Sequence, residues 1–206
     1  MRLLAFVVAA FLPAAALAAP IQPIYYSYII APNGGSAYLD DTYNGTTGQL
    51  TDGISATLPW SNTDGFGAPG PNVGWQGTNP TIQFNFDQVY SFGAMVVNFQ
   101  DNEGAFGVGL AETMTVNGVT SPTLTSPNAP GGGNVRSPID VTMDLTAVAP
   151  TDTLTLTINR EFFWTFVSEV SFDSTPPTAA VPVPASLPLL LGCLGVIGLL
   201  ARRRRP

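Results

Sequence analysis

The sequence predicts an all-β protein whose strands form an antiparallel β-sandwich. Three observations support this. The chain between its two ends lacks a helical period, short apolar runs recur between turn residues as in a sandwich or jelly roll, and glycine and proline are abundant, with 21 and 19 of 206 residues. About 150 residues in such strands can bury one hydrophobic core. We therefore expect a single sandwich domain.

The first strands are indicated by their side-chain patterns. Residues 24–30 (Ile-Tyr-Tyr-Ser-Tyr-Ile-Ile) are the first candidate. Residues 81–86 alternate cleanly, with Ile, Phe and Phe on one face and Thr, Gln and Asn on the other. Residues 92–99 are more apolar and predict a buried strand. Before them, residues 59–80 contain so many Gly and Pro residues that we expect a long loop, of the kind that often carries function.

A hairpin and three further strands complete the predicted sandwich. Asn117 and Gly118 both tolerate positive φ, so they predict a type I′ turn between strands at 113–116 and 119–124. A second Gly-rich loop is expected at 126–138. The last strands are expected at 139–145, 154–159 and 166–172.

The amino terminus has the features of a secretory signal peptide. Arg2 gives a positive start, residues 3–12 are apolar, and Ala16-Leu17-Ala18 supplies the small residues of a cleavage site. We expect residues 1–18 to be removed, which would place the protein outside the cytoplasm.

The carboxyl terminus has the features of a membrane segment. Residues 185–201 are predominantly apolar, about 25 Å of helix against a bilayer core of ~30 Å. Four arginines close this segment, and positive charge stays on the cytoplasmic side, so the preceding chain is expected outside. The tail consists of the motif Val181, Pro182, Val183, Pro184 and Ala185, the apolar segment, and the cluster Arg202, Arg203, Arg204 and Arg205.

This tail resembles the PEP-CTERM sorting signals, in particular the VPLPA-CTERM type, with Val183 where that pattern has Leu. The resemblance implies a membrane-anchored precursor that an exosortase cleaves near the Pro-containing motif, leaving the protein at the cell surface or in the extracellular matrix. An ordinary tail anchor is the alternative. The expected organisation is a signal peptide (1–18), a β-sandwich domain (19–173), a Pro/Thr/Ala linker (174–180) and the sorting signal (181–206).

The charge of the exported part excludes several functions. All fourteen acidic residues lie within residues 19–180, which keep Arg136 and Arg160 as their basic residues, so the net charge there is 2 − 14 = −12. Nucleic-acid binding is therefore not expected, because it depends on clustered Lys and Arg. The chain has no His, and Cys193 lies in the tail, so catalysis would rest on carboxylates that the sequence gives no means to pair. We expect a protein that is not an enzyme.

Short motifs along the domain follow one another in a recognisable order. They are residues 49–53 (Gln-Leu-Thr-Asp-Gly), Trp60, residues 74–77, residues 80–86, residues 114–118, residues 144–146 and residues 168–170. This order resembles the discoidin, or coagulation-factor C-type, domain, a galactose-binding-like jelly roll. Two departures are Asp87-Gln88 after the Phe-Asn-Phe strand and the single Arg160 near the end.

The discoidin resemblance implies a structural calcium ion held by the Asp-Gly loop and a Glu of the final strand. Calcium takes six to eight oxygen ligands and accepts carboxylates mixed with carbonyls. The alternative is that Asp52 starts a turn and Glu169 is a solvated strand residue. Asp40-Asp41 with Asn44 is a weaker calcium candidate and reads more simply as a turn. The implied ligands are the side chains of Asp52 and Glu169, Thr57, and the carbonyls of Gln49, Ile54 and Ser168.

Aromatic side chains in the long loop are the candidate sugar contacts. Trp60, Phe66 and Trp75 could offer ring faces to sugar C–H groups, and the alternative for both tryptophans is core packing. Two functions follow. One is a structural or interaction protein among the polysaccharides of the cell surface or extracellular matrix. The other is a carbohydrate-binding module with a defined glycan site.

Overall fold

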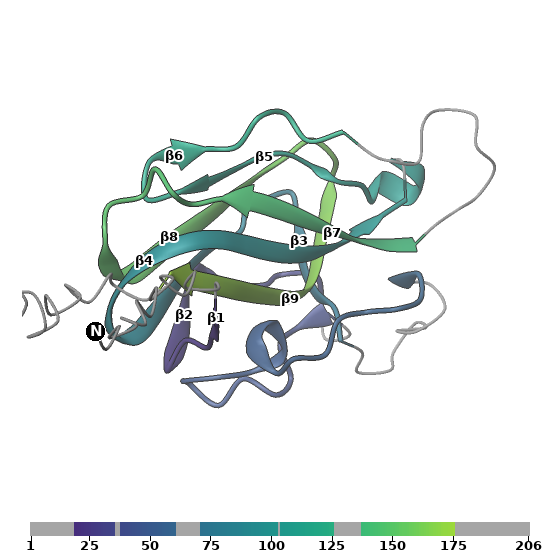
Figure 1. Ribbon diagram of the computed structural model, residues 1–206. Helices are drawn as coiled ribbons and strands as arrows, with labels where there is room; N and C mark the ends of the chain where they lie inside the picture. Colours follow the sequence, from purple (N-terminus) through teal and green to yellow (C-terminus); the bar gives the residue numbers. More distant parts are fainter. Residues whose placement is uncertain (1–18, 36–37, 61–70, 103, 126–136, 176–206) are drawn as a thin grey trace, which may run out of the picture. The chain divides into compact units, whose positions relative to one another are not determined.

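Antiparallel strands provide the regular structure of the described chain, apart from two short 3₁₀ turns, in a computed structural model (Figure 1). The structure describes residues 19–35, 38–60, 71–102, 104–125 and 137–175. The all-β prediction is thus confirmed for these residues. The signal peptide, Phe66 and the sorting signal lie outside them.

The 3₁₀ turns are η2 (Gln49–Thr51) and η3 (Ala105–Gly107). The strands are β1 (Ala19–Ile21), β2 (Tyr25–Ile30), β3 (Val73–Gln76), β4 (Thr81–Asp101), β5 (Ala111–Val116), β6 (Val119–Thr120), β7 (Ser137–Asp144), β8 (Thr151–Arg160) and β9 (Trp164–Thr175). The strands are not hydrogen-bonded in chain order: the main path runs β1-β9-β4-β8-β5-β6, so most neighbouring strands are far apart in sequence.

Strand β4 belongs to two groups of paired strands and joins them. Its residues 81–90 pair with β2 and β8, and β8 continues to β5 and β6. Its residues 91–101 pair with β7 and β9, and β9 carries β1 and β3 on its other edge (Figure 1). The two groups enclose one core to which both contribute fully buried side chains, such as Phe84 and Val97 of β4 and Val170 of β9. This arrangement is a sandwich.

The expectation of two separate strands at 81–86 and 92–99 was wrong, because both belong to β4. The register with β8 is irregular between Asn85 and Tyr90, where the intervening residues are mostly exposed. An irregularity of this kind bends a strand and increases its twist. The bend lets one strand serve both groups, and the exposed residues Asp87 and Gln88 lie within it.

One strand, β3, was not predicted from the sequence, because its glycine indicated a loop. Strand β3 lies inside the expected loop at 59–80. A Cβ added at Gly74 would lie 2.6 Å from Cε1 of Phe166, so glycine is required there by close packing in a strand. The predicted hairpin turn is confirmed, with φ of 48° at Asn117 and 86° at Gly118. Its second strand, β6, is shorter than expected.

No helix among the described residues is long and apolar enough to cross a membrane.

Candidate functional site

Trp75 is a core residue, so its assignment as a ligand contact was wrong. It is 0% exposed, and its indole N–H donates to the carbonyl of Ile30 at 3.0 Å. Its ring also contacts Tyr28, with centroids 5.9 Å apart. β3 pairs with β9, and Val73 and Trp75, two residues apart on β3, are both fully buried on the core face.

Trp60 belongs to a second, smaller apolar cluster that we call the inner aromatic stack, consisting of Trp60, Phe166, Trp164 and Tyr38. Trp60 and Trp164 lie parallel to Phe166, at centroid distances of 5.7 and 5.4 Å and interplanar angles of 11° and 6°. Phe166 is 1% exposed, whereas Trp60 and Trp164 are half-buried. Trp60 is therefore mainly a packing residue.

Three other phenylalanines form a group that we call the aromatic rim: Phe106 and Phe163, which are exposed, and Phe162, which is half-buried. Phe106 is 71% exposed and Phe163 is 54% exposed. Phe162 and Phe163 lie in the turn between β8 and β9, and Phe106 lies in η3. Exposing large apolar side chains costs solvation free energy, so a group of them marks a contact surface.

Contacts with glycines hold the aromatic rim in place. The Phe162 ring lies against Gly104 and Gly109, where an added Cβ would come within 2.4 and 2.3 Å of it. The carbonyl of Phe163 accepts the N–H of Gly77 at 2.8 Å, and Gly107 lies against Phe163 Cβ. These contacts join η3, the end of β3 and the β8–β9 turn.

Phe106 is held in a strained conformation. Its φ of 57° and ψ of 19° are left-handed helical values, which cost a non-glycine residue of order 1 kcal/mol. The ring is largely exposed, so burial of this side chain does not offset that cost. Backbone strain at an exposed aromatic residue is typical of a functional position.

Polar groups surround the same end of the sandwich. The Asn33 side chain accepts the N–H of Gln76 at 2.6 Å and donates to its carbonyl at 3.0 Å. The Asn79 side chain accepts the N–H of Arg160 at 3.4 Å, and the Arg160 guanidinium donates to the Phe162 carbonyl at 3.0 Å. The side chain of Gln76 is exposed. The rim therefore combines apolar ring faces with hydrogen-bonding groups, as small-ligand sites do.

The segment from η2 to Thr57, which we call the 49–57 loop, lies against β9 at the residues named for calcium. Gly53 N–H donates to Glu169 Oε2 at 3.1 Å, and Ala56 N–H donates to Ser168 Oγ at 2.9 Å. Asp52 accepts the N–H of Ile54 at 2.8 Å, so Asp52 does form a turn. The structure thus brings four of the six predicted residues together: Asp52, Ile54, Ser168 and Glu169.

The other two calcium candidates are placed differently. Gln49 begins η2 and is buried, with its N–H bonded to Asp40. Thr57 is exposed one residue after Ala56. The alternative in which Glu169 is a solvated strand residue was wrong, since Glu169 is 6% exposed.

Glu169 is electrostatically unusual. Burial, with a smaller contribution from the negative charge of Asp52, raises the pKa of its carboxyl to about 7, although the N–H of Gly53 opposes the shift. Within the described residues the basic side chain is Arg160, which lies at the aromatic rim. The charge of Asp52 thus acts on Glu169 with no described cationic side chain beside them, an arrangement that a bound cation would stabilise.

The oxygen donors here fit calcium in part. Among the described residues there is no group of three or more His, Cys, Asp or Glu that could hold a metal. Two carboxylates would have to be completed by main-chain carbonyls and a hydroxyl, a mixture that calcium accepts and zinc does not. The residues present are thus compatible with calcium.

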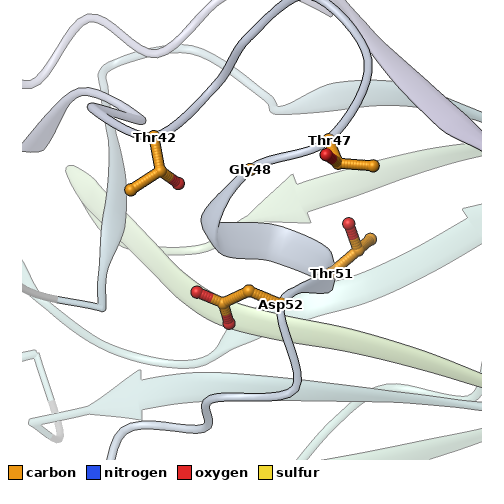
Figure 2. Close-up of a pocket in the computed structure, with 5 residues that line it drawn as sticks. All are labelled: Thr42, Thr47, Gly48, Thr51 and Asp52. Atoms are coloured by element: carbon orange, nitrogen blue, oxygen red, sulfur yellow. The ribbon is translucent and has the colours of Figure 1, made fainter.

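A small open pocket of about 350 Å³ lies beside this loop, lined by Thr42, Thr47, Gly48, Thr51 and Asp52. Figure 2 shows Thr42 and Thr47 on the chain before Gly48, and Thr51 and Asp52 at the end of the helical turn.

Behind this pocket, Asp40 accepts hydrogen bonds from the hydroxyls of Tyr26 and Tyr28. It also accepts the N–H of Gln49 at 3.0 Å. Burial raises the pKa of both tyrosines, and the Asp40 hydrogen bonds act in the same direction. Sequence reasoning assigned Asp40 to a turn and missed this network. The pattern of Tyr26 and Tyr28 on one strand face, each needing an acceptor when buried, was the signal available.

No protein-family model matches this sequence, and no curated protein matches it. The chain resembles several solved structures at low similarity. A truncated AlyQ with CBM32 and alginate lyase domains has a TM-score of 0.47 and 10% identity, covering 78% of this chain and 34% of that one. The CBM32 of AlyQ in complex with 4,5-unsaturated mannuronic acid gives 0.43 and 11%, covering 75% and 97%. The family 32 CBM of C. perfringens NanJ in complex with galactose gives 0.39 and 11%, covering 74% and 98%.

This chain spans about a third of the length of the two-domain AlyQ structure. At these identities and TM-scores, the similarity assigns neither a family nor a ligand to this chain.

Proposed function

We propose that this chain is an exported, non-catalytic protein of the cell surface or extracellular matrix that contacts polysaccharide through the aromatic rim. The observation that carries the proposal is the exposure of Phe106 and Phe163 on an end of the sandwich where Gln76 is also exposed. Ring faces pack against sugar C–H groups, and amides bond sugar hydroxyls. A galactose-binding-like jelly roll would present its loops in this way.

β9 runs from the aromatic rim to the residues that precede the linker in sequence. β9 begins at Trp164, beside the rim, and ends at Thr175, after which the linker and sorting signal follow in sequence. Twelve residues of strand span roughly 36 Å. Ala19, the first residue after the proposed signal cleavage, pairs with Ser174. Ala19 and Thr175, the described residues next to the two processing signals in sequence, therefore lie at the end of β9 opposite its rim end.

The tail itself is proposed to be an exosortase-type sorting signal. Its Pro motif, short apolar segment and four arginines stand in the order that such a signal requires.

Replacing Phe163 by alanine should weaken polysaccharide binding about tenfold or more, which corresponds to about 1.4 kcal/mol. The ring is exposed, so folding should change little. Affinity electrophoresis in gels containing dissolved polysaccharide measures the binding, and thermal unfolding checks the fold. The matched control is Val89→Ala, which removes another apolar side chain that is 55% exposed, near the Tyr90–Thr151 end of β8 rather than the Arg160 end. If the two variants bound polysaccharide equally well, the aromatic rim would not be the binding site.

A carbohydrate-binding module with a defined glycan site is the second candidate, favoured by the strained Phe106. Such strain is retained where a ring must be held in one position. Saturable binding of an oligosaccharide distinguishes this candidate from a more general matrix contact.

We also propose that a structural calcium ion binds between the 49–57 loop and β9, held by the carboxylates of Asp52 and Glu169, by Thr57, and by the carbonyls of Gln49, Ile54 and Ser168. The closeness of the two acidic side chains supports this proposal. The ion would fasten the loop to the sandwich and contribute folding free energy.

In chelator, the protein should lose stability as pH rises from about 4.5 to about 7. The pKa of Glu169 is raised in the folded state from 4.5 to about 7, so the folded protein holds the proton more tightly than the unfolded chain. That stabilisation is complete below pH 4.5 and is lost as pH passes 7. Calcium should raise the unfolding temperature by several degrees above pH 7, where the carboxylate is ionised. Thermal unfolding across pH, with calcium or chelator, measures both effects.

Glu169→Gln imitates the protonated side chain and separates the two contributions. It should be at least as stable as the original protein in chelator at pH 8, and calcium should no longer stabilise it. Glu112→Gln, at an exposed position, is the matched control and should keep the calcium response. An unfolding temperature that is the same with calcium and chelator in the original protein would exclude the calcium proposal.

A further inference from the structure

The described surface is strongly acidic. Of the fourteen acidic residues, Asp64 and Glu103 lie outside the described part, which leaves 14 − 2 = 12, against Arg160 as its basic residue. A net charge of this size repels polyanions and slows their association, most strongly at low ionic strength.

The aromatic rim does not reverse this charge locally. Arg160 is followed in sequence by the exposed Glu161. On the neighbouring strand, Ala111 is paired with Arg160, and the next residue is the exposed Glu112. Arg160, the positive charge that the described part of the rim holds, thus has one acidic residue beside it in the chain and another on the adjacent strand.

Part of the hydrogen-bonding capacity of the Arg160 guanidinium is already taken up within the protein. One of its N–H groups donates to the carbonyl of Phe162 and helps to shape the turn that carries Phe163. Arg has five N–H donors in all. The remaining donors can bond a sugar hydroxyl. The described rim has no second cationic side chain, so it cannot neutralise the repeated carboxylates of an acidic polymer.

We propose that the aromatic rim binds an uncharged glycan and discriminates against acidic polysaccharides such as polyuronates. This inference rests on the proposed function, because it specifies the ligand class of the same site. Ring stacking and amide hydrogen bonds need no charge on the ligand. The acidic surface then contributes to specificity, because it repels a negatively charged polysaccharide and does not repel a neutral one.

Affinity electrophoresis of the purified protein in gels containing galactomannan, xyloglucan, dextran, alginate or polygalacturonate tests the proposal. We expect retardation by at least one of the three neutral polymers, unchanged by added NaCl, and none by the two polyuronates. Phe163→Ala in the same gels reports whether the rim makes the contact. Glu161→Lys changes the local charge by two units and should introduce retardation by polygalacturonate at low salt that added NaCl removes.

The possible failures are distinguishable. Stronger retardation by alginate or polygalacturonate than by every neutral polymer, lost at high salt, would overturn the uncharged-ligand inference and leave polysaccharide binding intact. Retardation by none of the five polymers would count against the proposed function and the inference together. If Glu161→Lys introduced no retardation by polygalacturonate at low salt, surface charge would not set the specificity.

Discussion

Replacing Trp75 by alanine should lower the free energy of unfolding by about 3–5 kcal/mol. Trp75 is among the largest fully buried side chains, and alanine would leave a cavity between β3 and the rest of the core. The Ile30 carbonyl would also lose its indole donor. Urea-induced unfolding, followed by circular dichroism, measures the change.

A matched substitution shows whether this effect is specific to the core. Trp60→Ala removes the same side chain from a half-buried position in the inner aromatic stack, where one face of Phe166 remains covered by Trp164. It should cost about 1–3 kcal/mol, clearly less than Trp75→Ala. If the two variants were equally stable, Trp75 would not have the core role that its burial indicates. Loss of glycan binding in Trp75→Ala would in any case report unfolding rather than a lost contact.

The sequence predicted the strands best where alternation was regular. Ile82, Phe84 and Phe86 alternate with polar residues, and all three are buried in β4 as expected. β3 was missed because Gly74 reads as a loop residue, although its small size serves packing against Phe166. Such a role depends on a partner ninety-two residues away in the chain, which local sequence cannot reveal.

The sequence predicted the acidic pair Asp52 and Glu169 but did not predict the aromatic rim. The meeting of Asp52 with Glu169 followed from the resemblance of short motifs, and the structure brings the two residues together. The rim was missed. Phe162 and Phe163 stand in a run of three aromatic residues, and three consecutive aromatic side chains cannot all face inward at a tight turn. Asking which of them must be exposed would have indicated the site.

Replacing Asp40 by asparagine should lower the free energy of unfolding by about 3–5 kcal/mol. The carboxylate accepts hydrogen bonds from both Tyr26 and Tyr28 and from the N–H of Gln49. An amide has a single acceptor oxygen, so at least one of these donors would lose its partner, and each buried unpaired group costs about 1–3 kcal/mol. A Cβ added at Gly48 would come within 2.6 Å of Asp40, so the site has little room to rearrange.

Two comparisons identify the hydrogen bonds as the cause. Asp41→Asn makes the same chemical change at the next, exposed residue and should alter stability by less than about 0.5 kcal/mol. Adding Tyr26→Phe and Tyr28→Phe to Asp40→Asn should cost less than the three separate changes together, because the added substitutions remove the donors that Asp40→Asn leaves unpaired. Urea-induced unfolding of the five proteins gives the coupling free energy. Strict additivity would mean that the tyrosine hydroxyls are satisfied by water and that Asp40 acts only as a turn residue.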